Sequence, residues 1–213
     1  MISAIFSLAN FSYLFFVLKA KDVFPGKYEI LLPILLYALF YLIYSIFAYP
    51  FGKLGDKKGK RRILMAGYLM FFFVNIGFLL FSSVYAYVAL FIFYGLVFAM
   101  TQGNQVAYVA DHCNEKSKGT VIGLFYGITG LMAILSGVCV GLLWDVSKNY
   151  VFVFGAVLSL ACFAMMLWAR SVRVRNRKKN IKQKQLHNLL MNEVGTISAG
   201  EALSRAKKRW KNI

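Results

Sequence analysis

The chain has 213 residues, 60% of them hydrophobic, and a mean hydropathy of +0.62. This apolar fraction exceeds the roughly 45–50% that is typical of soluble globular domains, so the composition excludes an ordinary soluble protein. The formal net charge is +17, and it is concentrated in a few polar segments that separate long apolar blocks. Apolar blocks of this kind indicate membrane-spanning helices.

Six apolar runs lie within residues 1–169. The first is about 17 residues long, which is the low end for a spanning helix, and its basic residues follow it, whereas those of a signal peptide come first. The fourth run is the longest, and polar residues interrupt its later part. We expect an all-α integral membrane domain with spans at 2–18, 30–49, 63–81, 85–108, 120–143 and 151–168.

The polar links predict the orientation of the chain, because Lys and Arg are enriched in cytoplasmic loops. The links after the second and fourth runs hold eight Lys and Arg, and the links on the opposite side hold four. Residues 170–213 add thirteen Lys and Arg and two acids on the side of the first group. We therefore expect six spans with both termini in the cytoplasm.

Residues 170–213 are expected to form a basic tail outside the membrane domain. A polybasic segment at the end of a membrane helix favours contact with anionic lipid headgroups. Leu186, Leu189 and Leu190 give a weak apolar stripe, which is typical of an interfacial helix. The alternative is a disordered tail. Nucleic-acid binding is not expected, because the tail begins at the bilayer surface.

A short polar loop, Gly52–Leu64 (GKLGDKKGKRRIL), separates the second and third runs. Its cations follow the general charge bias of cytoplasmic loops. That bias explains neither the lone acid, Asp56, nor the spacing of the glycines, which permit a tight turn. The segment resembles the GxLaDrxGrkxxl loop of the major facilitator superfamily. Matching positions are Gly52, Leu54, Asp56, Gly59, Arg61 and Leu64, with conservative matches at Gly55, Lys57 and Lys60.

The resemblance covers most of residues 1–168. Leu8–Ser12 (LANFS), Ala110–Leu124 and Gly141–Asp145 (GLLWD) look like the second half of a bacterial transporter of this superfamily. Members usually have twelve helices in two halves of six. The resemblance therefore implies the carboxy-terminal six-helix half, built as two three-helix inverted repeats, in the bacterial inner (plasma) membrane. It also implies transport of a small solute by alternating access.

The resemblance further implies a cytoplasmic gate at the polar loop, formed by Gly52, Leu54, Asp56, Lys57, Gly59, Lys60 and Arg61. Asp56 would cap a helix end or meet a cation. The cations would hold neighbouring helix ends, whose carbonyls carry partial negative charge. The alternative is that the loop only determines topology. On the same side of the membrane, Asp111, Glu115 and Lys118 are candidates for an ion network with this loop, or are simply solvated charges.

Four uncharged polar residues at membrane depth are candidates for the translocation path: Asn10, Gln102, Asn104 and Gln105. Each must find a partner or face a wet cavity. Hydrogen bonding between helices is the alternative for any one of them. Compared with relatives, which often carry Glu at position 102 and Lys at position 106, this chain is uncharged at both. No Asp, Glu, Lys, Arg or His lies in the central part of any run, so no proton relay is visible.

The fifth run carries glycines four residues apart, a spacing that lets helices approach closely. Helix packing is therefore predicted for Gly123, Gly127, Gly137 and Gly141, the alternative being a helix that slides at the interface between halves.

The leading hypothesis is the carboxy-terminal half of a transporter, with a separate amino-terminal half or a second copy as its partner. The alternative is a non-transporting membrane fragment or a membrane-anchored interaction module. An enzyme is disfavoured, because the sequence lacks a nucleophile–base constellation, a metal-ligand cluster and a phosphate-binding loop. The three cysteines are interpreted as small hydrophobic residues, and no metal or cofactor is expected. The sequence does not indicate which solute is carried.

Overall fold

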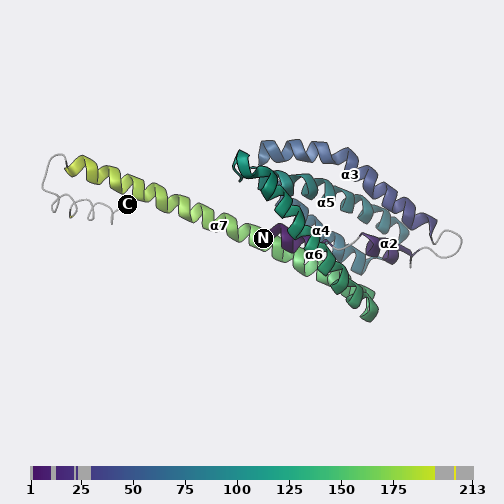
Figure 1. The fold of residues 1–213 in the computed structure, drawn as a ribbon. Coiled ribbons are helices and arrows are strands. Elements are labelled where there is room, and N and C mark those ends of the chain that lie inside the picture. Colours follow the sequence, from purple (N-terminus) through teal and green to yellow (C-terminus); the bar gives the residue numbers. More distant parts are fainter. Residues whose placement is uncertain (1, 11–12, 22, 24–29, 195–203, 205–213) are drawn as a thin grey trace. The chain divides into compact units, whose positions relative to one another are not determined.

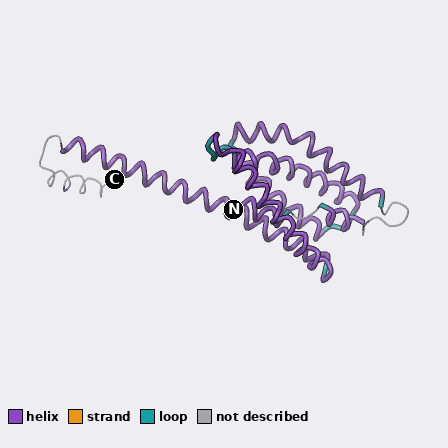
Figure 2. Tube along the Cα trace, in the orientation of Figure 1, coloured by secondary structure: helices purple, strands orange, loops and turns teal. Residues whose placement is uncertain are grey.

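The computed structural model describes residues 2–10, 13–21, 23, 30–194 and 204. Helices make up nearly all of this described chain, joined by short loops and turns (Figure 2). Six stretches are long and apolar enough to cross a membrane. The structure thus confirms the predicted all-α fold with six spans.

The helices are labelled in Figure 1. They are α1 (Ile2–Ala9), α2 (Leu14–Lys21), α3 (Leu31–Lys58), α4 (Lys60–Leu80), α5 (Val84–Ala110), the short 3₁₀ helix η2 (Glu115–Ser117), α6 (Lys118–Val146) and α7 (Lys148–Val194).

The centre of the fold is the packing of α5 along both α3 and α4 (Figure 1). α1 packs against α6, and α2 packs against α3. Aromatic rings fill the core between them. Tyr94 of α5 stacks on Phe16 and Phe40, with ring centroids 4.5 and 4.8 Å apart, and Phe78 of α4 stacks on Phe152 of α7 at 5.5 Å. Rings at these distances and in these geometries attract each other beyond their burial, so α2, α3, α4, α5 and α7 share one aromatic core.

The first predicted span is divided in the structure. α1 ends at Ala9 and α2 begins at Leu14, so Asn10 follows the end of a helix rather than lying inside one. The backbone amide of Asn10 still donates to the carbonyl of Phe6 at 2.7 Å. A helix that ends within the membrane leaves backbone groups to be satisfied, and transporters tolerate this where the backbone lines a cavity.

The second predicted span was too short. α3 continues through Pro50 to Lys58, so Pro50 lies inside the helix and does not close it. Proline removes one backbone donor, which membrane helices tolerate because neighbouring groups satisfy the freed carbonyl. As a result α3 delivers its charged end directly to the start of α4.

α7 continues well beyond the predicted end of the sixth span. Its residues up to Met166 belong to the compact six-span unit, and the chain from Leu167 on forms a second unit. Leu186, Leu189 and Leu190 lie within α7, but their side chains, and most of residues 195–213, are outside the described part. Contact between the tail and lipid headgroups stays a prediction.

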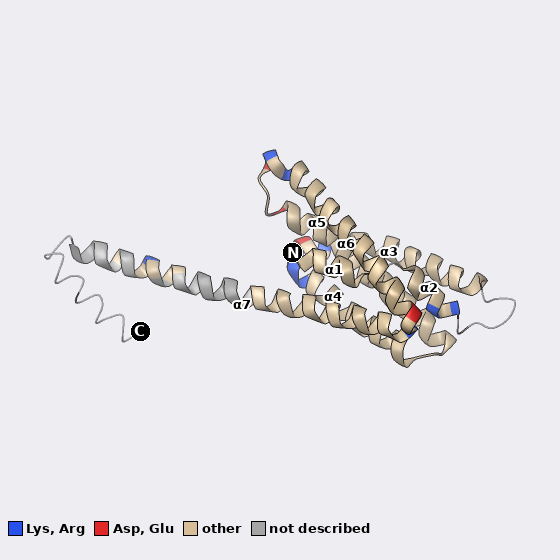
Figure 3. Ribbon diagram, turned by 60° about the horizontal axis from the view of Figure 1, so that its bottom comes forward, with Lys and Arg blue, Asp and Glu red and all other residues tan. Residues whose placement is uncertain are grey.

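Charged residues gather at the ends of the helices α1 to α6, and the long middle parts of these helices carry none (Figure 3). Many large apolar side chains of these middle parts are exposed, among them Leu42, Phe73, Leu131 and Leu142. In water such surfaces would be costly, whereas a bilayer solvates them. α6 is the most exposed spanning helix, and Ser136 and Val140 are its buried residues.

Candidate gate and translocation site

The polar segment 52–64 is not a loop. Its first part is the end of α3, and α4 begins at Lys60, so a single residue, Gly59, separates two helices. Gly59 has a φ of +94°, the only positive value among the described residues. This conformation strains residues with a Cβ, which explains why glycine stands at that position of the motif. The expected tight turn therefore rests on Gly59 alone.

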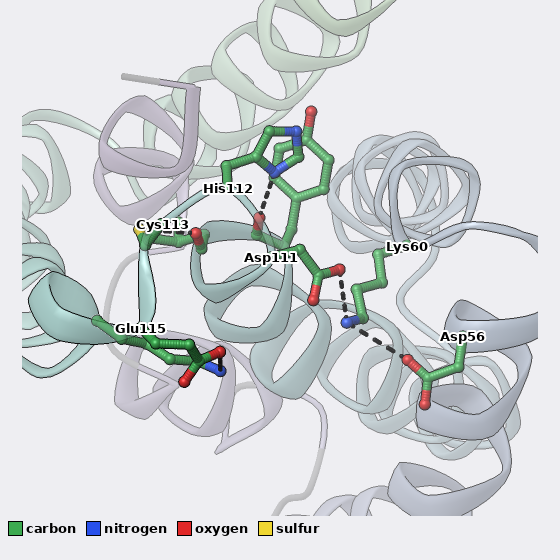
Figure 4. A network of polar contacts seen from close by, with 9 residues as sticks. Asp56, Lys60, Asp111, His112, Cys113 and Glu115 are labelled. Carbon is green, nitrogen blue, oxygen red and sulfur yellow. Dashed lines mark hydrogen bonds and ion pairs between the residues drawn. The ribbon is translucent and has the colours of Figure 1, made fainter.

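Lys60 is the centre of a charge cluster that joins three helix ends (Figure 4). Its Nζ lies 2.7 Å from Oδ2 of Asp111, which follows α5, and 3.4 Å from Oδ1 of Asp56 in the last turn of α3. The Lys60 side chain is 15% exposed, and those of Asp56 and Asp111 are 69% and 53% exposed. The cation is thus shielded, and the two acids reach it from the water side.

Helix dipoles explain the arrangement of the cluster. Asp111 sits at the carboxy-terminal end of α5, where the partial negative charge of the helix disfavours an acid. Lys60 offsets that repulsion. Asp56 precedes α4, whose amino-terminal end carries partial positive charge and favours an acid. The cluster therefore holds the ends of α3, α4 and α5 at one side of the membrane domain.

Arg61 points elsewhere. Its Nη2 group donates a hydrogen bond to the backbone carbonyl of Met166, which attaches the start of α4 to α7. The other members of the predicted gate make fewer contacts with neighbouring helices. Lys57 is exposed, Leu54 is half-buried, and a Cβ added at Gly52 would meet no atom within 4 Å.

Gly55 is a contact site for Asn104 of α5. A Cβ at Gly55 would lie 2.1 Å from the Asn104 side-chain oxygen, so only glycine leaves room for this asparagine. The Asn104 amide donates to the carbonyls of Phe51, at 3.3 Å, and Met100, at 3.0 Å. Asn104 is buried and contacts α3, which fits the predicted alternative of hydrogen bonding between helices; its place on the translocation path stays a prediction.

Glu115 and Lys118 do not reach the cluster around Lys60. They pair with each other at 3.4 Å across the start of α6, and both are solvent-accessible. Of the three residues of the predicted ion network, Asp111 contacts a described residue of the polar segment 52–64, namely Lys60. Beside it, the His112 ring contacts the carbonyl of Tyr108 at 2.8 Å, and the Cys113 thiol donates to the carbonyl of Val109 at 3.1 Å (Figure 4).

The other three candidates for the path come together in one pocket between α1, α5 and α6. Its volume is about 330 Å³. Among the residues that line it, none is Asp, Glu, Lys, Arg or His. The lining residues are Phe6, Ser7, Asn10, Gln102, Gln105, Val106, Phe125, Tyr126, Thr129, Gly130 and Ala133.

The polar groups of the pocket differ in how well they are satisfied. Asn10 Oδ1 accepts a hydrogen bond from the Tyr94 hydroxyl at 3.4 Å, and the Gln105 amide donates to the Tyr68 hydroxyl at 3.4 Å. Gln102 is exposed, and its side chain makes no hydrogen bond with a described residue. An amide of this kind at membrane depth requires water or a ligand.

The predicted packing glycines of α6 face no described residue of this chain, so packing of these glycines against another helix stays a prediction. A Cβ added at Gly123, Gly127, Gly137 or Gly141 would meet no atom within 4 Å. At about 100° per residue these glycines occupy a different face of α6 from Ser136. That serine makes the contact with α1, because its hydroxyl donates to the carbonyl of Leu8 at 2.7 Å. The glycine face is therefore open.

Comparison with known proteins decides the family. The model of the Major Facilitator Superfamily matches residues 1–212. The chain belongs to the major facilitator superfamily. It is 39% identical over 171 residues to an uncharacterized MFS-type transporter of Methanocaldococcus jannaschii. The match covers 79% of this chain and 43% of that transporter, so the chain spans less than half the length of this relative.

Membership explains the broad features of the molecule. Facilitator-superfamily proteins are membrane transporters, so the chain is an integral membrane protein of a transporter family. The relative comes from an archaeon, and the bacterial inner membrane stays a prediction, as do the cytoplasmic termini.

Two features were missed by sequence reasoning. The first is the contact of Gly55 with Asn104, which joins positions far apart in the sequence. The second is Thr129, which lines the pocket. Its polar side chain within an apolar run was a signal that could have identified it.

Proposed function

We propose that this chain is the carboxy-terminal half of a transporter that moves a small solute by alternating access. The polar pocket between α1, α5 and α6 is the observation that carries the proposal. It brings together Asn10, which follows the end of α1, and Gln102, whose amide makes no hydrogen bond with a described residue. In secondary transporters, substrate sites lie near the middle of the membrane, at interrupted helices between repeats.

The lining supports a small uncharged polar solute as the substrate class. Asn10 and Gln102 supply hydrogen-bond donors and acceptors, and Phe125 and Tyr126 supply aromatic walls. The Thr129 hydroxyl donates to the carbonyl of Phe125 and therefore supplies an acceptor. A charged solute would need a countercharge at membrane depth, where an unpaired ion is expensive. The described lining offers none. The pocket would form one side of a site that the second half completes.

The cluster around Lys60 would act as the gate. Exposed ion pairs each contribute about 0–1 kcal/mol, so the contacts of Lys60 with Asp56 and Asp111 are weak enough to form and break during a cycle. Because one cation holds three helix ends, its contacts would change together. A difference of that size between two states biases their populations without locking either.

The open glycine face of α6 supports a second half as the partner. Gly123, Gly127, Gly137 and Gly141 offer close approach to another helix. We place a separate amino-terminal half first. The alternative partner is a second copy of this chain, which would have to form the cavity from two identical polar faces.

A chimera tests the function. This chain would replace the matching segment of the Methanocaldococcus jannaschii transporter, and proteoliposomes would be assayed for flux of glucose and uridine, which are uncharged, and of glutamate and choline, which are charged. We expect flux of an uncharged probe, lost in Gln102→Leu. Flux of charged probes only would overturn the substrate class. Flux by this chain alone as a monodisperse monomer would overturn the half-transporter proposal. Absence of all flux in a well-folded chimera would favour a non-transporting membrane module.

A further inference from the structure

A second pocket lies away from the polar one, on the outer face of α4 and α5. It is a groove with a volume of about 450 Å³, and every residue that lines it is apolar. The floor is Val74 and Gly77, and the walls include Phe73, Leu90 and Phe93. Phe73 is 60% exposed and Phe93 is 48% exposed, so the groove opens to the surroundings of the protein.

The groove is long and follows one stripe of α4. Its lining runs from Ala66 to Phe81 with helical spacing. This length corresponds to about 22 Å along a helix. The hydrocarbon core of a bilayer is about 30 Å thick, so a groove of this length fits inside it. A groove of this length and apolarity therefore matches an extended acyl chain better than a compact solute.

A cation stands at one end of the groove. Arg62 lies four residues before Ala66 on the same stripe of α4, and it is exposed. Arg62 makes no ion pair with a described residue. Its neighbour Arg61, in contrast, donates a hydrogen bond to the carbonyl of Met166. Side chains on a helix lean toward its amino-terminal end, so the guanidinium projects past the groove toward the membrane surface. A guanidinium at that level is suited to a phosphate group.

From these observations we propose that the groove of α4 and α5 binds one anionic phospholipid, with an acyl chain along Ala66–Phe81 and its phosphate on Arg62. The site is separate from the polar pocket and does not depend on the transport proposal. A second copy is a poorer occupant. A two-fold axis along the membrane normal would bring residues of equal depth together, and the two Arg62 side chains would repel each other.

Native mass spectrometry of the purified full chain tests the proposal, with added phosphatidylglycerol or phosphatidylcholine of identical acyl chains. The basic tail is present in every variant compared, so its headgroup binding is common to all of them. We expect the chain to retain one phosphatidylglycerol and to prefer it about fivefold over phosphatidylcholine. This is the ratio of affinities that one cation near an anionic headgroup provides. Arg62→Gln should remove this preference. Lys58→Gln, which removes an exposed cation near the same helix end, should keep it.

A second pair of variants tests the groove itself. Ala66→Phe fills the groove at the Arg62 end and should abolish the retained lipid, whereas Ala89→Phe, the same change at an exposed position of α5 outside the lining, should not. Each variant is first checked for a monodisperse peak and an unchanged melting temperature. Equal retention of both lipids by the unmodified chain, or an unchanged preference in Arg62→Gln, would overturn the proposal. A lipid-free dimer that Ala66→Phe dissociates would also overturn it.

Discussion

The fit between Gly55 and Asn104 makes a prediction that runs against the usual effect of alanine in a helix. Gly55→Ala should destabilise the membrane domain, although alanine at an ordinary helical position is worth about 1 kcal/mol over glycine. The family pattern itself has alanine at this position, so the expected penalty is specific to a chain that carries asparagine at position 104.

The magnitude follows from the contacts. A Cβ at Gly55 would lie 2.1 Å from the oxygen and 3.0 Å from the Cγ atom of Asn104, so the asparagine must move. Its hydrogen bonds to the carbonyls of Phe51 and Met100 would then be lost or lengthened, at about 0.5–1.5 kcal/mol each. Overpacking adds about 1–3 kcal/mol. After subtraction of the propensity gain of about 1 kcal/mol, we expect a net loss of about 1–5 kcal/mol.

Thermal unfolding in a mild detergent, followed by the fluorescence of the three tryptophans of the chain, measures this loss. A loss of 1 kcal/mol lowers Tm by about 2–4 °C in a chain of this size. Gly52→Ala is the matched control, because it lies one turn away in the same helix and meets no atom within 4 Å. It should be neutral or stabilising.

A double variant separates steric conflict from a general effect on α3. Asn104→Ala removes the side chain that the new methyl group would meet, so adding Gly55→Ala to Asn104→Ala should cost much less than adding it to the unmodified chain. If Gly55→Ala were as stable as Gly52→Ala, or equally costly in both backgrounds, the proposed contact would be refuted.

Three further predictions concern the gate and the orientation of the chain. In the chimera, Asp56→Asn should cut flux strongly at unchanged membrane abundance, and unchanged flux would reduce the motif to a topology signal. Lys60→Gln should cut flux at least as much as Asp56→Asn, because it removes both contacts of the cluster, and a smaller effect would contradict its central place. Cysteines introduced at Lys53 and Ser82 should react with impermeant reagents from opposite sides of the membrane, and reaction from one side only would refute the six-span topology.

Sequence reasoning predicted elements whose signal is local. Long apolar runs mark spans whatever the tertiary structure, and the third span, predicted at 63–81, is α4 at Lys60–Leu80. The motif also identified Gly59, because one residue between two helices needs a backbone conformation that glycine adopts readily. The family followed from the same thirteen residues and was confirmed.

The errors came from properties that depend on distant residues. Pro50 looks like a helix end in sequence, but a neighbouring helix and the bilayer keep α3 intact through it. Asn104 and Gln102 are two residues apart and both polar, so sequence alone assigned them one role. The helix directs Asn104 into the contact with Gly55 and leaves Gln102 in the pocket. The face of α6 that packs could not be predicted, because glycines allow contact without specifying a partner.

The central claim, that the pocket of α1, α5 and α6 belongs to a translocation path, is tested most directly by side-specific labelling. In the chimera with Cys113, Cys139 and Cys162 replaced by alanine, a cysteine at Gln102 is exposed to an impermeant thiol reagent from each side of the membrane. We expect reaction from both sides, whereas a cysteine that replaces Leu135, an exposed apolar residue near the middle of α6, should react from neither. Failure of the Gln102 cysteine to react from either side, or reaction as slow as at Leu135, would contradict the claim.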